Sequence, residues 1–209
     1  MPASSETDWD AIRGELLAMA DEDRTVRAEL ARDGALFDGY HPRMEAIHRR
    51  NAARLRALLD AHGWPGVSRV GAEGAEAAWL LLQHAIGDPA LMRRGLEALT
   101  DAVESGEAAP LHRAMLEDRI RVFEGRGQRY GTQFDWDEEG NLSPLPLEDS
   151  EGVDARRRGI GLPPLELDLP RRREAMADSA ERPPEDAAKR RREYEEWLRR
   201  VGWRREEDR

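Results

Sequence analysis

The feature that most constrains the fold of this chain is an unbroken apolar stretch between Ala75 and Ile86. Its sequence is AEAAWLLLQHAI, and after Glu76 its only polar side chains are Gln83 and His84. The stretch is shorter than a membrane span. A helix that is apolar all round is normally the buried centre of a soluble domain. The sequence therefore predicts a helical domain built around this segment.

Four further helices are predicted before residue 125 from the 3.6-residue spacing of apolar side chains and from start and stop signals. Their expected ranges are residues 8–33, 42–61, 89–104 and 110–123. Later elements are weaker: a short extended piece at 67–70, a hairpin with an acidic turn at 134–142, and one short helix near 153–158. The fold class is mainly α, a single domain of about five core helices with a short β-hairpin and a charged C-terminal helix or tail.

The chain divides into an N-terminal helix at 1–37, a core helical domain at 38–169 and a charged tail at 170–209. Two prolines at 183–184 favour a final helix in the tail. The apolar stripe of this helix consists of Tyr194, Trp197, Leu198 and Val201. Because this stripe is thin, three states remain open: a docked helix, a helix ordered by a protein partner, or disorder. We expect the tail to contribute little to core stability.

Composition excludes several classes of function. The 209 residues include no cysteine, so disulfides, thiolate metal sites and cysteine nucleophiles are excluded. The net charge of −10 argues against general nucleic-acid binding, which favours a basic surface. No apolar run is long enough for a membrane span, and the N-terminus lacks a basic, apolar signal. We expect a cytoplasmic protein without nucleic-acid or membrane partners.

Four polar residues occupy positions where the helical pattern predicts burial: Asn51, Gln83, His84 and Asp118. Burying such a group without a partner costs a few kcal/mol. We therefore expect these side chains to satisfy one another or a ligand. Each also has a structural explanation, since His84 stands near a helix end, Asn51 can cap a backbone, and Asp118 can hold Arg119.

A polar loop follows the predicted fifth helix at residues 125–133, with the sequence GRGQRYGTQ. It contributes Gln128, Tyr130, Thr132 and Gln133, whose amides and hydroxyls are groups that orient a small ligand. An ordinary helix exit followed by a polar turn is the alternative interpretation. The proximity of this loop to Asp118 favours a binding site.

Chemical roles follow if these residues converge. His84 is the natural general acid or base near neutral pH, with Asp118 as the group that orients it. Arg119 can bind an anionic group with two hydrogen bonds. The only nearby hydroxyl candidates for a nucleophile are Ser68 and Thr132, and neither lies in a nucleophile motif. His84 and Asp118 are thus the predicted catalytic residues. The predicted substrate-binding residues are Asn51, Gln83, Arg119, Gln128, Tyr130, Thr132 and Gln133.

The spacing Glu45-x-x-His48 is found in di-metal helical bundles and offers a metal site as an alternative. His84 and Asp88 could add ligands to it. A di-metal bundle needs a second such motif and two more carboxylates, and the sequence offers neither. Phosphate-loop, dinucleotide and zinc-finger patterns are also absent from the sequence. We therefore expect no metal and no cofactor.

Residues from about 38 to 169 resemble an uncharacterised bacterial family that is known only as a domain of unknown function. The motifs that carry the resemblance are Asn51, Gly63-Trp64-Pro65 with Ser68 and Gly71, Ala78-Trp79, Gln83-His84-Ala85, Asp118-Arg119, and Gln128-x-Tyr130-Gly131-Thr132-Gln133. The resemblance supports grouping these residues into one site and implies no established activity. Residues 1–37 and 170–209 lie outside it.

Two functional hypotheses follow. The first is an acid–base enzyme, a hydrolase or a lyase, that acts on a small polar molecule or peptide. The second is a non-enzymatic module, such as a sensor or an immunity-type protein, that uses the same site or binds a protein through 170–209. A purely structural helical domain would leave the buried polar residues unexplained. We favour the enzyme slightly.

Overall fold

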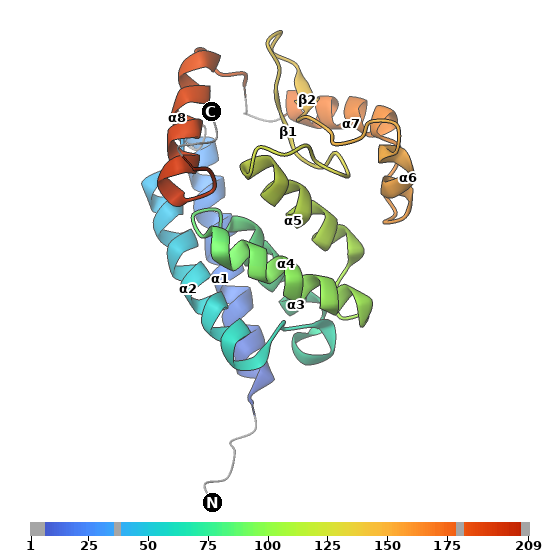
Figure 1. Ribbon diagram of the computed structural model, residues 1–209. Helices are drawn as coiled ribbons and strands as arrows, with labels where there is room; N and C mark the ends of the chain where they lie inside the picture. The colour runs from blue at the N-terminus through green and yellow to red at the C-terminus, as the bar shows by residue number, and fades with distance from the viewer. Residues whose placement is uncertain (1–6, 36–38, 179–181, 206–209) are drawn as a thin grey trace, which may run out of the picture.

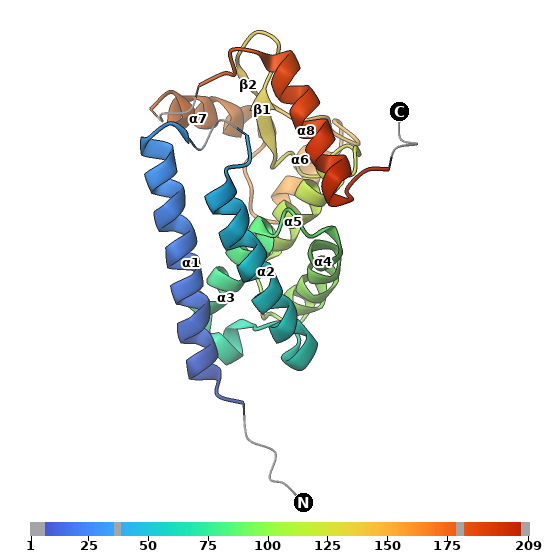
Figure 2. The ribbon, with the colours of Figure 1, turned by 90° about the vertical axis from the view of Figure 1, so that its left-hand side faces the viewer.

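Helix α3 (Val67–His84) forms the centre of the helical domain, as its apolar composition predicts. Ala77, Ala78 and Leu82 on this helix are fully buried. The computed structural model describes residues 7–35, 39–178 and 182–205. The helices that pack against α3 are α1 (Trp9–Arg32), α2 (Pro42–His62) and α4 (Pro89–Glu104). Figure 2 shows α1 and α2 side by side and antiparallel.

The mainly α fold class is confirmed. Helix α5 (Pro110–Phe123) packs against α4 and completes the five helices expected before residue 125. A two-stranded antiparallel hairpin follows, with Phe134 opposite Pro144. The elements after α5 are β1 (Phe134–Trp136), β2 (Leu142–Pro144), α6 (Val153–Arg158), α7 (Leu165–Ala177) and α8 (Ala187–Val201). Among the described residues, no helix is long and apolar enough to cross a membrane.

The extended piece expected at 67–70 is wrong, because these residues form the first turn of α3. The turn is capped from a distant segment: the Val67 N–H donates to the Glu107 carbonyl and the Ser68 N–H to the Glu107 carboxylate. Gly71 then interrupts the helix with a φ of 70°. Glycine tolerates this left-handed conformation at no steric cost. The turn therefore depends on a tertiary contact that the local sequence does not show.

The C-terminal helix is docked on the core, which is one of the three states that the sequence leaves open. Trp197, Leu198 and Trp203 are all buried within the main hydrophobic cluster. The Trp203 indole N–H also donates to the Ile86 carbonyl at 2.7 Å. Burial of these three large apolar side chains is enough to anchor a single helix, even though its apolar stripe is short.

Helix α7 was not predicted, because it has no apolar face to detect. None of its residues is buried, and Pro170 lies inside it. Ion pairs and backbone contacts hold it instead: Arg157 is fully buried and bonds Asp168 at 2.7 Å. The Arg173 side chain reaches the Leu142 carbonyl in β2 at 2.8 Å. Such long-range polar contacts leave no periodic signal in the sequence.

Candidate functional site

Three helices bring one acidic and two imidazole side chains together. Asp23 comes from α1, His48 from α2, and His84 is the last residue of α3. One ligand atom from each lies within 4.8 Å of the other two. The rings of the two histidines are 4.9 Å apart. We refer to Asp23, His48 and His84 as the Asp–His–His cluster.

The strongest contact in the cluster joins Asp23 to His84. The Nδ1 atom of His84 lies 2.9 Å from both carboxylate oxygens of Asp23. Asp23 is fully buried, whereas the His84 side chain keeps 19% of its surface exposed. Within the described residues the second ring nitrogen, Nε2, makes no hydrogen bond. His84 is thus held by one nitrogen, and the other has no partner among the described residues.

His48 completes the cluster from the opposite side of Asp23. Its Nε2 lies 3.1 Å from the Asp23 carboxylate but lacks the alignment of a hydrogen bond. Its Nδ1 lies 2.7 Å from the hydroxyl of Tyr40. Tyr40 in turn packs edge-on against Trp197 of α8, with the ring centroids 5.8 Å apart. The docked C-terminal helix therefore supports the residue that positions His48.

Burial and hydrogen bonding act against each other in the cluster. Burial raises the pKa of Asp23, but the close contacts with the His48 and His84 imidazoles outweigh it and lower that pKa well below its usual range. Burial lowers the pKa of His84, and its contact with Asp23 opposes this only in part. At neutral pH the cluster therefore contains an ionised carboxylate beside an uncharged His84.

Asp118 does not orient His84, which corrects the catalytic pairing expected from the sequence. Its carboxylate accepts backbone hydrogen bonds from Arg129 at 2.6 Å, from Tyr130 at 3.1 Å and from Thr132 at 3.0 Å. It also accepts the hydroxyl of Thr132 at 2.9 Å. Burial raises the pKa of Asp118, and these hydrogen bonds oppose the rise. Asp118 therefore fixes the conformation of the polar loop.

Three of the loop residues expected to bind substrate use their polar groups inside the protein. The Gln128 amide donates to the carbonyls of Gln133 and Leu145, and its oxygen accepts the Gln133 N–H. The Tyr130 hydroxyl accepts from Arg113 at 3.0 Å. The Thr132 hydroxyl is taken by Asp118, as described above. The loop is thus held by its own internal hydrogen bonds, and Gln133 is the loop residue whose side chain bonds Arg119.

Arg119 connects the loop to the helix that ends in His84. Its Nη1 donates to the Gln83 carbonyl at 3.0 Å and its Nε to the Gln133 side chain at 3.2 Å. No carboxylate among the described residues forms an ion pair with it. Burial lowers the pKa of Arg119 to about 10, which leaves it charged at neutral pH. The guanidinium of Arg119 is therefore a cation without a carboxylate partner among the described residues. It contacts Gln83, the residue directly before His84.

Asn51 and Gln83, which the sequence analysis assigns to substrate binding, stand close in sequence to the two histidines of the cluster. Both are buried, and neither their amide nitrogens nor their oxygens have a hydrogen-bond partner within the described chain. Asn51 lies one helical turn after His48, and Gln83 directly precedes His84. An unpaired buried amide costs about 1–3 kcal/mol per group. Two such residues next in sequence to the histidines make this region the candidate functional site.

Asp23 and Tyr40 were missed from the sequence, and His48 was assigned to a different partner. The signal for Asp23 was present, because it stands seven residues after Leu16 and seven before Leu30, on the buried face of α1. It was hidden in the acidic run at 21–23. No local pattern could indicate that this carboxylate meets a histidine that is 61 residues away.

A model for a family of unknown function, DUF6624, matches residues 10–177. The chain belongs to the DUF6624 family. The DUF6624 region therefore begins within α1 and ends within α7, which corrects the limits of 38 and 169 expected for the resemblance. It includes the whole Asp–His–His cluster and Arg119. No curated protein and no solved structure matches the chain.

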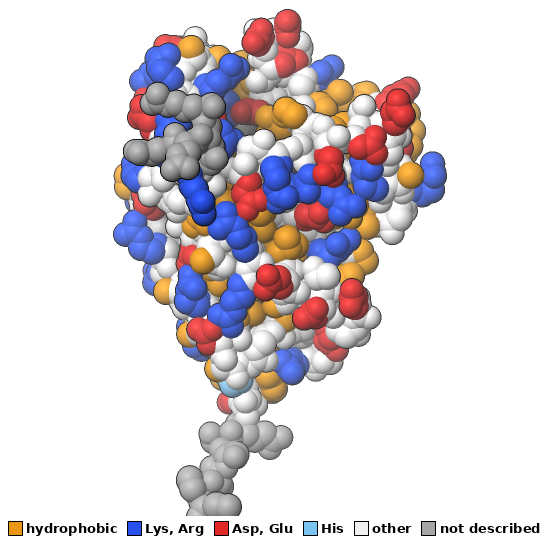
Figure 3. Space-filling model, in the orientation of Figure 1, with side chains coloured by type: hydrophobic (Ala, Val, Ile, Leu, Met, Phe, Trp, Pro, Cys, Tyr) orange, Lys and Arg blue, Asp and Glu red, His pale blue; other side chains and the backbone are white. Residues whose placement is uncertain are grey.

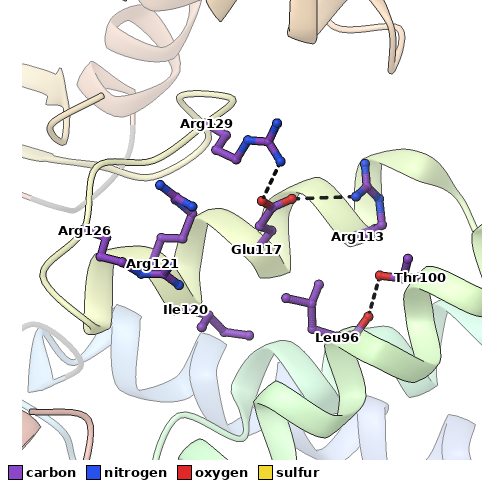
Figure 4. A pocket seen from close by; sticks show the side chains of 8 residues that line it. All are labelled: Leu96, Thr100, Arg113, Glu117, Ile120, Arg121, Arg126 and Arg129. Carbon is purple, nitrogen blue, oxygen red and sulfur yellow. Dashed lines mark hydrogen bonds and ion pairs between the residues drawn. The ribbon is translucent and has the colours of Figure 1, made fainter. Parts of the chain in front are cut away.

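A second polar region lies in the groove between α4 and α5 (Figure 4). This groove encloses about 290 Å³ and is rich in arginine. Its arginines are compensated, since Glu117 pairs with Arg113 and Arg129, and Arg121 pairs with Glu148 at 2.7 Å. Acidic and basic side chains are interspersed across this face of the molecule (Figure 3). The groove therefore lacks the uncompensated charge that Arg119 provides.

Proposed function

We propose that this DUF6624 protein binds a small anionic molecule beside His84 and performs acid–base chemistry on it, as a cytoplasmic hydrolase or lyase. The observation that carries the proposal is the pair formed by Asp23 and His84, in which Nδ1 is hydrogen-bonded and Nε2 is left without a partner. A histidine with one fixed nitrogen and one free nitrogen is suited to accept and return a proton.

Asp23 has two roles in this mechanism. By accepting the Nδ1–H of His84 it fixes the tautomer whose lone pair is on Nε2. Its buried negative charge then stabilises the imidazolium that forms when Nε2 takes a proton from water or substrate. The lowered pKa of His84 keeps the imidazole uncharged before the reaction, so that it begins as a base.

Arg119 supplies the ligand-binding part of the proposal. A guanidinium without a carboxylate partner favours a carboxylate or phosphate group, which it binds through charge-assisted hydrogen bonds. Gln133 holds the Nε edge of Arg119 and orients it. A small substrate bound to Arg119 would have its reactive part near His84, because Arg119 also bonds the residue that precedes it.

The test begins with a thermal-shift screen of small carboxylates and phosphate esters against the full chain. Hits are then measured for binding and turnover with His84→Ala and with the matched control His112→Ala. The control is close, because the His112 side chain is 18% exposed and pairs with a carboxylate as His84 does. We expect His84→Ala to lower turnover by about 10²- to 10⁴-fold and His112→Ala to leave it unchanged.

Two outcomes would contradict the proposal. Turnover that survives His84→Ala would remove the catalytic role of this residue. Binding of a hit without any turnover would favour the second candidate, a non-enzymatic sensor or interaction module that uses the same residues.

A further inference from the structure

The Asp–His–His cluster has the composition and geometry of a transition-metal site. We propose that Asp23, His48 and His84 bind one divalent transition-metal ion of the zinc class. Two imidazoles and one carboxylate form a ligand set that such ions favour, whereas calcium and magnesium prefer all-oxygen sites. The proposed function involves no metal, so this inference goes beyond it. Binding of the ion can also be measured without any substrate.

The distances within the cluster agree with a shared ion. Metal–nitrogen and metal–oxygen bonds of about 2.0–2.2 Å place neighbouring ligand atoms of one ion roughly 3 Å apart. Nδ1 of His84 lies 2.9 Å from the Asp23 oxygens, and Nε2 of His48 lies 3.1 Å from one of them. Each imidazole therefore already stands at the distance from Asp23 that two ligands of one ion have, and all three ligand atoms lie within 4.8 Å of one another.

The orientation of His48 is better explained by a metal than by a hydrogen bond. Its Nε2 is buried and close to Asp23, yet it lacks a hydrogen-bond partner within the described residues. The opposite nitrogen contacts the Tyr40 hydroxyl at 2.7 Å. Metal-bound histidines usually have such a polar partner on the nitrogen that does not coordinate, since it fixes the ring. Tyr40 is thus placed to position His48 as a ligand.

The arrangement leaves coordination positions open. Three protein ligands with further positions free for water or substrate are typical of catalytic rather than structural sites. The three ligands stand on three different packed helices, so their positions are fixed by the core. The single carboxylate leaves a bound divalent ion with net positive charge, which would attract an anion in the same way as Arg119.

Metal binding changes one step of the proposed mechanism. The ion would take the place of the proton on His84 Nδ1, and the uncharged ring would carry its single proton on Nε2 instead. Such an ion would supply a bound water as proton donor and nucleophile precursor, and His84 would act as one of its ligands. The role of Arg119 is unaffected. Stoichiometric binding together with absent turnover would support the metal site and refute the proposed function, so the two fail separately.

The experiment uses the full chain after treatment with a chelator. Zn²⁺ is titrated calorimetrically, and Co²⁺ is added as a spectroscopic probe of coordination. We expect one ion per chain and visible Co²⁺ absorption bands. His48→Ala and His84→Ala should each weaken binding by about 100-fold or more, and Tyr40→Phe by about tenfold. His112→Ala should bind as the wild type does. The absence of cysteine removes thiolate sites as an alternative.

X-ray absorption of the Zn²⁺-loaded wild type makes the test independent of whether any variant folds. We expect two imidazole ligands in its spectrum. The proposal is overturned by an absence of stoichiometric binding, or by a spectrum with fewer than two imidazoles. It is also overturned by folded His48→Ala and His84→Ala proteins that bind the ion as tightly as His112→Ala. In these cases the cluster is a buried ion pair with a structural role.

Discussion

At the scale of single residues, the two buried aspartates divide the work that the sequence assigns to one. Asp118 accepts hydrogen bonds from the loop backbone, and Asp23 holds His84. Both are fully buried carboxylates on amphipathic helices, so burial alone does not distinguish them. Their partners distinguish them. Asp118 binds backbone N–H groups, which is a structural role, whereas Asp23 binds an imidazole whose second nitrogen is free to exchange a proton in the proposed reaction.

Asp118→Asn should therefore reduce stability rather than remove the site. Asparagine places an NH₂ group where the carboxylate now accepts N–H donors, and hydrogen bonds to buried charged groups contribute about 1.5–3 kcal/mol each. We expect the free energy of unfolding to fall by about 3 kcal/mol in urea denaturation. Asp101→Asn on the exposed face of α4 is the control and should change it by less than about 0.5 kcal/mol. Equal stabilities would show that the loop does not depend on Asp118.

Arg119→Gln should weaken the binding of anionic ligands from the screen about tenfold or more, because it removes the uncompensated charge. The matched control is Arg121→Gln on the same helix, where the arginine also donates to a loop carbonyl but has Glu148 as its counter-ion. Titration calorimetry of both variants separates ligand binding from loop support. Equal losses in the two variants would argue that the arginines only hold the loop.

At the scale of elements, the helices follow from local periodicity, and their partners do not. The ranges of α4 and α5 agree with the sequence, since proline at the first turn and a regular apolar face define them. Helix α8 was predicted in position but not in role. Its stripe is short, and only the tertiary structure shows that Trp197 and Leu198 reach the core and support Tyr40.

Leu198→Ala tests the docking of α8. Leu198 is fully buried, and removal of a buried leucine side chain typically costs about 2–5 kcal/mol. Leu167→Ala on α7 is the control, because that leucine is 56% exposed. We expect a clear drop in melting temperature for the first variant and almost none for the second. Identical melting temperatures would restore the expectation that the tail adds little to the core.

Alanine substitutions at Gly127 in the polar loop and at Gly14 in α1 should change stability in opposite directions. A Cβ at Gly127 would lie 2.6 Å from the Glu148 nitrogen, and backbone cannot move aside easily, so Gly127→Ala should destabilise the loop. A Cβ at Gly14 in α1 meets nothing within 4 Å. Gly14→Ala should raise stability by about 0.5–1 kcal/mol through helix propensity. Thermal denaturation of both variants checks the two signs, and a stable Gly127→Ala protein would contradict the close approach.

At the scale of the whole molecule, the site is a product of packing between distant helices. The sequence predicts the polar positions Asn51, Gln83 and His84, because each interrupts an apolar face; the first two are buried and His84 is partly exposed. It does not predict their partners, since the contact between Asp23 and His84 spans 61 positions and depends on how α1 lies against α3. Nearness to the polar loop in the sequence favoured Asp118 as the partner of His84. The packing of α1 against α3 makes Asp23 that partner instead.

The most direct test of the central claim is the tautomeric state of His84, measured by nitrogen-15 NMR on the histidine-labelled, chelator-treated full chain. We predict that Nδ1 carries the proton and Nε2 does not, because Asp23 accepts from Nδ1. Asp23→Asn should remove this preference, and Asp118→Asn should leave it unchanged. A His84 protonated at Nε2 in the wild type, or a tautomer that changes with Asp118→Asn and not with Asp23→Asn, would contradict the account.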